Sequence, residues 1–274
     1  MRLRELVFAG IILAMKIATW NVNSLKVRLP HLLRYLEADT APDILLLQEL
    51  KCQTDDVPRA DIEALGYHVE AVGQKTYHGV AIISKQPISV VLRHLPGDET
   101  DEQARYLEAD IAGLRVAALY LPNGNPVETE KYPYKLGWMA RLADRAATLL
   151  AEDRPFLLGG DYNICPTDVD LYDPVGWRDD ALVRPESRAA FRRLLNLGLT
   201  EAFHALHPHA AHVYSFWDYQ AGAWQRDNGL RIDHLLLSPA LADRLEACEI
   251  DKEPRGWERA SDHTPVWCRL REVA

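Results

Sequence analysis

The 274-residue sequence lacks the cysteine patterns and phosphate-binding motifs that define several large enzyme classes. No P-loop lysine motif, dinucleotide G-x-G-x-x-G or G-x-S-x-G nucleophile elbow occurs, which argues against nucleotide hydrolases, Rossmann enzymes and serine hydrolases of those types. The four cysteines include no C-x-x-C pair, and their spacing favours neither a zinc site nor a disulfide framework. We therefore expect reduced thiols in a cytoplasmic protein.

Excess positive charge and long apolar runs are also missing. A formal net charge of −9 argues against a protein coated in basic surface. A DNA enzyme can still combine acidic metal ligands with a local basic rim. The apolar run within residues 1–14 is too short to span a bilayer, and we expect no membrane partner. Met15 is interpreted as the native start, with residues 1–14 a start-site artefact or disordered extension and residues 15–274 a single catalytic domain.

Short apolar runs spread over the whole chain predict many strands and few helices. Predicted strands cover residues 16–21, 43–48, 67–72, 79–84, 88–95, 105–111, 114–121, 155–160, 230–237 and 264–270. Helical periodicity covers residues 30–38, 133–150 and 186–197. Tyr106, Glu108 and Asp110 alternate with apolar residues, which predicts a strand with one wet face. The pattern predicts an α/β fold in which two sheets pack face to face with helices outside.

Polar residues follow several of the apolar runs, where a rigid scaffold presents catalytic groups. Asn21 ends the first predicted strand, and Glu49 follows the buried run Leu45–Gln48. Asp161 and Asn163 come directly after two glycines, which permit a close approach of a phosphate or another backbone. The alternatives at these positions are a turn-forming Asn, a solvent-exposed strand end and an ordinary Asx turn.

Two further segments place acids inside or beside apolar strands. Asp233 interrupts the run Leu230–Leu237, where an unpaired charge is costly. Asp262 and His263 open the last strand, and a carboxylate on one ring nitrogen of His263 fixes its tautomer. Asp233 is the candidate partner of His263, and a surface histidine is the alternative.

These candidates share one chemistry, that of oxygen-rich metal sites without cysteine: Asn21, Glu49, Asp161, Asn163, Asp233, Asp262 and His263. Oxygen ligands favour Mg²⁺ or Mn²⁺ over Zn²⁺. A metal, several carboxylates and one histidine, with no covalent nucleophile, indicate water attack on a phosphodiester.

Seven segments together resemble one family. They are residues 20–23, 47–51, 79–84, 120–124, 160–170, 229–233 and 261–263. In this order they are similar to the exonuclease III and abasic-site (AP) endonuclease family of the endonuclease/exonuclease/phosphatase superfamily. The catalytic segments alone place a chain in the superfamily, whereas the stretches around Asp161 and Asp233 resemble the AP endonuclease branch.

The resemblance implies a four-layer, deoxyribonuclease I-like α/β sandwich with the site at one edge. It implies that Glu49 holds the metal, with Asn21 and Asp262 nearby, and that Asp161 activates the attacking water with help from Asn163. Asp161, Asn163 and His263 are also counted among the expected metal-site residues. The resemblance further implies that His263, oriented by Asp233, binds the scissile phosphate beside Tyr120.

The implied substrate is double-stranded DNA with abasic sites or 3′ ends, cut by a monomeric Mg²⁺-dependent enzyme. Aromatic candidates for contact with the lesion are Phe216, Trp217 and Trp257, with core packing as the alternative. Basic candidates for phosphate contact are Lys51, Lys131, Lys135, Arg178, Arg226 and Arg231. Competing functions are a related phosphodiesterase acting on RNA or phospholipid headgroups, and a DNA-binding module with a decayed site.

Overall fold

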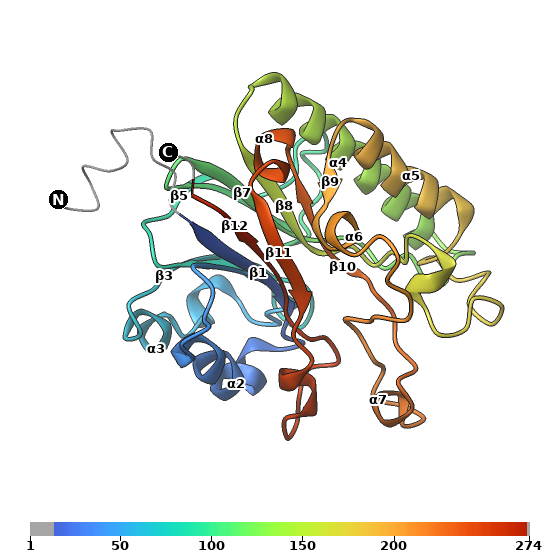
Figure 1. Cartoon of the computed structure of the whole chain (residues 1–274), viewed down its shortest axis with the longest axis horizontal. Helices are drawn as coiled ribbons and strands as arrows, with labels where there is room; N and C mark the ends of the chain where they lie inside the picture. Colours follow the sequence, from blue (N-terminus) through green and yellow to red (C-terminus); the bar gives the residue numbers. More distant parts are fainter. Residues whose placement is uncertain (1–13, 273–274) are drawn as a thin grey trace.

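The computed structural model describes residues 14–272 (Figure 1). The expectation for residues 1–14 therefore lies outside the described residues, except for Ala14. Within residues 14–272, none of the helices has the length and apolar character needed to cross a membrane.

The first sheet has six strands in the order β11-β12-β1-β2-β4-β3. β1 runs parallel to β2 and antiparallel to β12, so the chain's first and last described strands are neighbours. The strand bounds are β11 Leu245–Ile250, β12 Val266–Leu270, β1 Met15–Asn21, β2 Ile44–Gln48, β4 Val80–Ser84 and β3 His68–Val72.

The second sheet also has six strands, in the order β5-β6-β7-β8-β10-β9. β7 runs parallel to β8, and β10 pairs antiparallel with β8. The bounds are β5 Ser89–Leu92, β6 Tyr106–Ile111, β7 Leu114–Tyr120, β8 Phe156–Asp161, β10 Asp233–Leu237 and β9 Thr200–Glu201. The predicted two-sheet α/β sandwich is thus confirmed.

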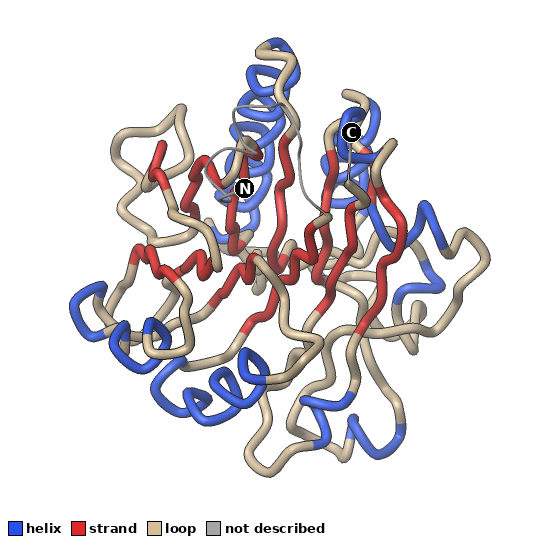
Figure 2. Tube along the Cα trace, turned by 60° about the vertical axis from the view of Figure 1, so that its left-hand side comes forward, coloured by secondary structure: helices blue, strands red, loops and turns tan. Residues whose placement is uncertain are grey.

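The two sheets pack face to face, and helices cover their outer faces (Figure 2). A buried apolar cluster fills the space between the sheets, with members from both: Ile17, Leu46, Ile82, Leu107, Val116, Leu157 and Leu235. Separate clusters join α2 (Leu25–Glu37) and α3 (Arg59–Glu63) to the first sheet, and α4 (Lys131–Ala151) and α5 (Pro185–Asn196) to the second. The four layers follow from strands that are apolar on both faces.

The three predicted helices are present, but α2 begins at Leu25 rather than at Pro30. The predicted range starts at Pro30 because it rests on the apolar face formed by Leu32, Leu33 and Leu36. Pro30 instead lies inside α2, where its missing N–H removes one helical hydrogen bond. The short helices α6 (Ala202–Leu206), α7 (Ala223–Arg226) and α8 (Pro239–Ala242), and the strands β9 and β11, lacked a sequence signal.

The predicted wet face of β6 is wrong, because α4 covers that face. Glu108 is fully buried and receives hydrogen bonds from Arg115 at 2.6 Å and from Arg145 at 2.6 and 2.9 Å. Tyr106 donates to the same carboxylate at 2.7 Å. The polar residue in the middle of this alternating pattern belongs to a buried ion-pair network and does not face water. A buried charge is tolerated in the interior when it is paired.

Gly160 allows β7 and β8 to approach each other closely at the residue before Asp161. A Cβ on Gly160 would lie 1.9 Å from the carbonyl oxygen of Leu119, so a side chain there requires the backbone to move. We predict that Gly160→Ala lowers the free energy of unfolding by at least the roughly 1–3 kcal/mol typical of an overpacked core.

The matched control is Gly137→Ala on α4, where no atom apart from its chain neighbours and the nearby helix backbone lies within 4 Å of the added Cβ. That change is expected to raise stability by about 0.5–1 kcal/mol because alanine favours the helix. Urea unfolding of both variants measures the difference. Equal stability of Gly160→Ala and the wild type would contradict the close strand contact.

Candidate active site

The polar residues of interest meet at one edge of the sandwich because of strand direction. β1 and β2 are parallel, so Asn21 and Glu49 leave the first sheet side by side. In the second sheet, Tyr120 pairs with Asp161 at the ends of β7 and β8, and Asp233 pairs with Asp161 at the start of β10. The face-to-face packing then places the two groups opposite each other.

The loops that leave these strands hold strained backbone conformations. Asn23, Glu49, Lys51 and Asn163 all have positive φ angles, of 44°, 53°, 53° and 48°. Such conformations cost energy for residues other than glycine and concentrate at functional sites. They turn the chain sharply enough to direct neighbouring polar groups into one space.

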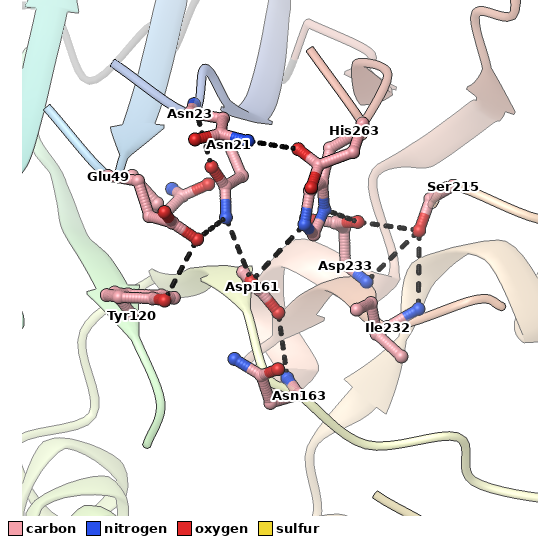
Figure 3. A network of polar contacts seen from close by, with 12 residues as sticks. Asn21, Asn23, Glu49, Tyr120, Asp161, Asn163, Ser215, Ile232, Asp233 and His263 are labelled. Atoms are coloured by element: carbon pink, nitrogen blue, oxygen red, sulfur yellow. Dashed lines mark hydrogen bonds and ion pairs between the residues drawn. The ribbon is translucent and has the colours of Figure 1, made fainter. Parts of the chain in front are cut away.

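The side chain of Asn21 joins the two sheets at this edge (Figure 3). Its Nδ2 donates to Oε1 of Glu49 at 2.9 Å and to Oδ2 of Asp161 at 3.0 Å. The hydroxyl of Tyr120 donates to the same Oε1 at 2.9 Å, and the ammonium of Lys51 lies 2.9 Å from Oε2. Each carboxylate is therefore held by donors from more than one element.

His263 lies on the other side of Asp161, against a second carboxylate (Figure 3). Its Nδ1 is 2.8 Å from Oδ2 of Asp233, and its Nε2 is 3.7 Å from Oδ2 of Asp161. The hydroxyl of Ser215 donates to Oδ2 of Asp233 at 2.6 Å. Asp161, Asp233 and His263 are all at least nine-tenths buried.

Burial and charge set the protonation of these groups. Burial opposes the charged imidazolium, but the carboxylates of Asp233 and Asp161 raise the pKa of His263 to about 10. Burial raises the pKa of Asp161, against the attraction of His263. Although burial favours neutral Glu49, the Asn21 hydrogen bond and Lys51 lower its pKa. Glu49 is thus held in its charged form, whereas the neighbouring Asp161 is protonated more readily than an ordinary aspartate.

The donor set fits a hard divalent cation. One oxygen from each of Glu49 and Asp161 and a ring nitrogen of His263 all lie within 4.8 Å of one another. Carboxylate and amide oxygens suit Mg²⁺ or Mn²⁺. Nδ1 of His263 is held by Asp233, so Nε2 is the ring nitrogen left for a metal ion or a phosphate oxygen.

Comparison with known proteins agrees with this arrangement. The sequence pattern that defines the Endonuclease/Exonuclease/phosphatase family matches residues 18–263. The chain belongs to this family. Exodeoxyribonuclease III of Haemophilus influenzae is 35% identical, over 94% of this chain and 100% of that protein. The chain therefore belongs to the exodeoxyribonuclease III and AP endonuclease branch of the family.

Solved structures of the family share the fold over nearly the full chain. The 3′ phosphatase NExo from Neisseria, bound to product DNA hairpin, is 42% identical with a TM-score of 0.90, covering 93% of this chain and 99% of that one. An AP endonuclease from Archaeoglobus fulgidus is 35% identical with a TM-score of 0.89, covering 93% and 99%. The resemblance found in the sequence is confirmed.

Two of the sequence-predicted site residues lie beside the central cluster. Asn163 donates its backbone N–H to Oδ1 of Asp161 at 2.8 Å, while its side-chain Nδ2 donates to the carbonyl of Leu121 at 3.0 Å. Asp262 accepts a hydrogen bond from Asn23 at 3.0 Å. Asn163 therefore acts on Asp161 through its backbone, and Asp262 lies on the Asn23 side of the site.

The candidates for DNA contact separate into accessible and enclosed residues. Phe216 is partly exposed and packs edge-on against His263, with ring centroids 4.9 Å apart, and Lys131 is exposed at the start of α4. Trp217 is fully buried and donates to Asp227 at 2.9 Å. Trp257 packs against Trp20, His31 and Arg34 but stays partly exposed. Burial disfavours Trp217, whereas Phe216, Trp257 and Lys131 remain partly or fully exposed candidates.

Arg231 does not belong to a surface rim, contrary to the expectation from its charge. Its side chain is buried, 2.8 Å from Asp170 and 3.1 Å from Glu201. Both carboxylates compensate the buried guanidinium, and the residue joins the Asp170 segment to Glu201 of β9. The sequence shows the charge of Arg231 but not its partners, so it could not distinguish a surface contact from a buried ion pair.

Sequence reasoning missed Ser215, Asn23 and Asn123. Ser215 bonds Asp233, and Asn123 donates to Oδ1 of Asn163 at 3.0 Å. Asn23 could have been suspected, since it lies two residues after Asn21. Ser215 carried no signal, because its position depends on bridges that join Leu230, Phe216 and His263.

Asp233 is expected to control the charge of His263. Replacing the carboxylate in Asp233→Asn removes the nearest opposite charge, so the pKa of His263 falls from its raised value. NMR titration of the imidazole measures the change, with Asp218→Asn in an exposed loop as control. An unchanged His263 titration in Asp233→Asn would contradict the pairing.

Glu201 is expected to stabilise the protein in a defined pH range. Burial opposes its charge, but Arg231 and His234 lower its pKa to about 2. The stability it contributes is present above the unfolded-state pKa near 4.3 and is lost as pH falls toward 2. We predict that Glu201→Gln lowers stability at pH 7 by about 3 kcal/mol, and that this difference shrinks below pH 4.

The control for this prediction is Glu246→Gln, which removes an exposed pair with Arg269 and is expected to change stability by less than about 0.5 kcal/mol. Urea unfolding at pH 7, 4 and 3 compares the three proteins. A Glu201→Gln deficit that is constant across this range would show that charge pairing is not its cause.

Proposed function

We propose that this protein, a DNA-repair phosphodiesterase of the exodeoxyribonuclease III type, uses Mg²⁺ to incise DNA 5′ to abasic sites. We propose that it also removes 3′ nucleotides or 3′ blocking groups. The observation that carries the proposal is the juxtaposition of a buried carboxyl, Asp161, with an imidazolium, His263, at the edge where both sheets end. The relatives include an exodeoxyribonuclease, a 3′ phosphatase bound to product DNA and an AP endonuclease.

The proposed roles follow from the protonation of each group. Asp161 takes the proton of the attacking water, because burial raises its pKa toward the range useful for a general base. The backbone N–H of Asn163 holds its other oxygen in place. The water oxygen bonds to phosphorus as the bond to the 3′ oxygen breaks, leaving a 3′ hydroxyl and a 5′ phosphate.

His263 and Tyr120 are proposed to contact the phosphate itself. Nε2 of His263 donates to a non-bridging oxygen, since the imidazolium carries protons on both ring nitrogens. Tyr120 keeps its hydroxyl proton, because burial and the charges of Glu49 and Asp161 raise its pKa well above the usual value. Its hydroxyl can therefore donate to the phosphate or to the leaving 3′ oxygen.

Glu49 is the residue proposed to hold Mg²⁺, with Asn21 and Asp262 beside it. When bound, the ion supplies positive charge that offsets the charge developing on the phosphate. Phe216 and Lys131 are proposed to contact DNA, the first beside the reacting phosphate and the second at the start of α4. The buried, unpaired cysteines are consistent with a reducing cytoplasm, and we propose that the protein acts as a monomer.

Cleavage of a labelled duplex that carries one abasic-site analogue tests the proposal. We expect incision 5′ to the lesion with Mg²⁺ and none with EDTA. Asp161→Asn and His263→Ala should each lower the rate roughly 10²–10⁴-fold, as is usual when a positioned acid–base group is removed. Circular dichroism confirms that both variants are folded.

An absence of incision by folded, Mg²⁺-supplemented protein would reject abasic-site cleavage. Parallel reactions with a 3′-phosphorylated duplex, single-stranded RNA and phosphoinositide vesicles then identify the activity. Faster cleavage of RNA or of a phospholipid headgroup would show that the protein is a phosphodiesterase for that substrate.

A further inference from the structure

Lys135 occupies a core position on α4 where an apolar residue is expected. The buried residues of this helix recur every three or four positions, and Lys135 lies on that face between Tyr132 and Trp138. Its side chain is fully buried. A lysine ammonium is rarely found in such a place without a specific function for its charge or its donors.

The ammonium of Lys135 bonds two loops that leave adjacent strands of the second sheet. Nζ donates to the backbone carbonyl of Asn123 at 2.9 Å and to that of Asn163 at 2.6 Å. The Asn123 loop follows β7 and the Asn163 loop follows β8. Both bonds are to backbone carbonyls, so Lys135 fixes the path of the chain.

The Asn163 loop is the one that holds Asp161. Asn163 has a φ of 48°, and its N–H bonds Oδ1 of Asp161 at 2.8 Å. The left-handed turn directs its carbonyl inward to Lys135. Its side chain is tied to the other loop through Asn123 and Leu121. A continuous set of contacts therefore runs from Lys135 to the carboxylate proposed as the base.

The surroundings of Lys135 are shaped to hold its stem. Gly124 lies against it with a φ of +92°, and a Cβ at Gly124 would be 2.7 Å from Cδ of Lys135. Burial lowers the pKa of Lys135 to about 7, which the negative charge of Asp161 partly opposes. The folded protein thus carries a cost for this ammonium that a methionine in the same place would avoid.

We propose that Lys135 is a positioning residue for phosphodiester hydrolysis: its ammonium ties the loops after β7 and β8 together and so fixes the Asn163 backbone that holds Asp161. The inference rests on the proposed function, because it assigns Lys135 to the same reaction. Lys135 bonds the carbonyl of Asn163, whose N–H bonds Asp161, and so acts on Asp161 through that loop.

The variant Lys135→Met tests this role, with Lys131→Met as the matched control one helical turn earlier. Loss of positioning should lower kcat for abasic-site incision roughly 10–100-fold per folded molecule. KM for the duplex should stay within about twofold, because the side chain of Lys135 is fully buried and cannot contact DNA. Lys131 is exposed at the start of the helix, so Lys131→Met should raise KM and spare kcat.

A double-mutant cycle distinguishes positioning from a purely structural role. If Lys135 acts through the Asn163 loop, adding Asn123→Ala to Lys135→Met should cost little further kcat, because both changes release the same loop. Adding Lys131→Met should leave kcat as low as in Lys135→Met alone and raise KM by the factor seen in Lys131→Met alone. Folded fraction is measured by urea unfolding, and Lys135→Gln replaces Lys135→Met if the latter does not fold.

An unchanged kcat per folded molecule in the Lys135 variant would overturn the proposal, as would losses that multiply fully with Asn123→Ala. These outcomes are separate from failure of the proposed function, which appears as an inactive wild type on the abasic duplex. In that case the same variants are compared on the 3′-phosphorylated duplex. A lower kcat in the Lys135 variant is again expected, and an unchanged kcat per folded molecule again overturns the proposal.

Discussion

The hydrogen bonds of the Asn21 amide are the contacts on which the site depends. One nitrogen bonds Glu49 beyond β2 and Asp161 at the end of β8, and thus links residues presented by different sheets. Two carboxylates repel each other when brought together in a buried place. A neutral donor between them offsets part of this repulsion without neutralising either group. The amide therefore allows a cation-binding carboxylate and a proton-accepting carboxyl to stand side by side.

The contacts around Glu49 and Asp161 give their two carboxyl groups different protonation behaviour. Glu49 receives Asn21, Tyr120 and Lys51, which favour its charged form. Asp161 is buried more deeply, and burial favours its neutral form. Separation of two carboxyl pKa values by their surroundings is the general way in which one fold provides both an acid–base group and a charged ligand.

The support for these groups lies outside the site itself. Asp233 and Ser215 fix His263 from one side, whereas Lys135 and Asn123 fix the Asn163 loop from the other. Both supports use buried polar groups that bond neighbouring segments, although Oδ1 of Asp233 has no hydrogen-bond partner among the described residues. Burying such polar groups lowers the stability of the fold, and they are retained where the geometry of a reacting group matters.

The layers and the central cluster could be predicted from sequence because both follow from strand pattern. Continuous apolar runs such as Ile44–Leu47 indicated buried strands, and polar residues at their ends indicated a shared edge. The partners of charged residues could not be predicted in the same way. Glu108, Lys135 and Arg231 all read as surface charges, yet each is buried with partners distant in sequence.

Short elements were missed for a related reason. β11 has three exposed or partly exposed positions at its start and is defined by pairing with β12, so its own sequence carries little periodicity. Ser215 likewise reaches Asp233 only because separate segments are bridged at Phe216, Leu230 and His263. Pairing between distant segments determines these features, and local pattern does not record it.

A crystal structure with a duplex carrying a non-hydrolysable phosphorothioate at an abasic analogue tests the central claim most directly. The account predicts that the scissile phosphate lies within hydrogen-bonding distance of Nε2 of His263, with Oδ atoms of Asp161 facing phosphorus on the side opposite the 3′ oxygen. A phosphate seated away from both side chains, with Asn21 still joining Glu49 and Asp161, would show that this cluster supports the fold and that the reaction takes place elsewhere.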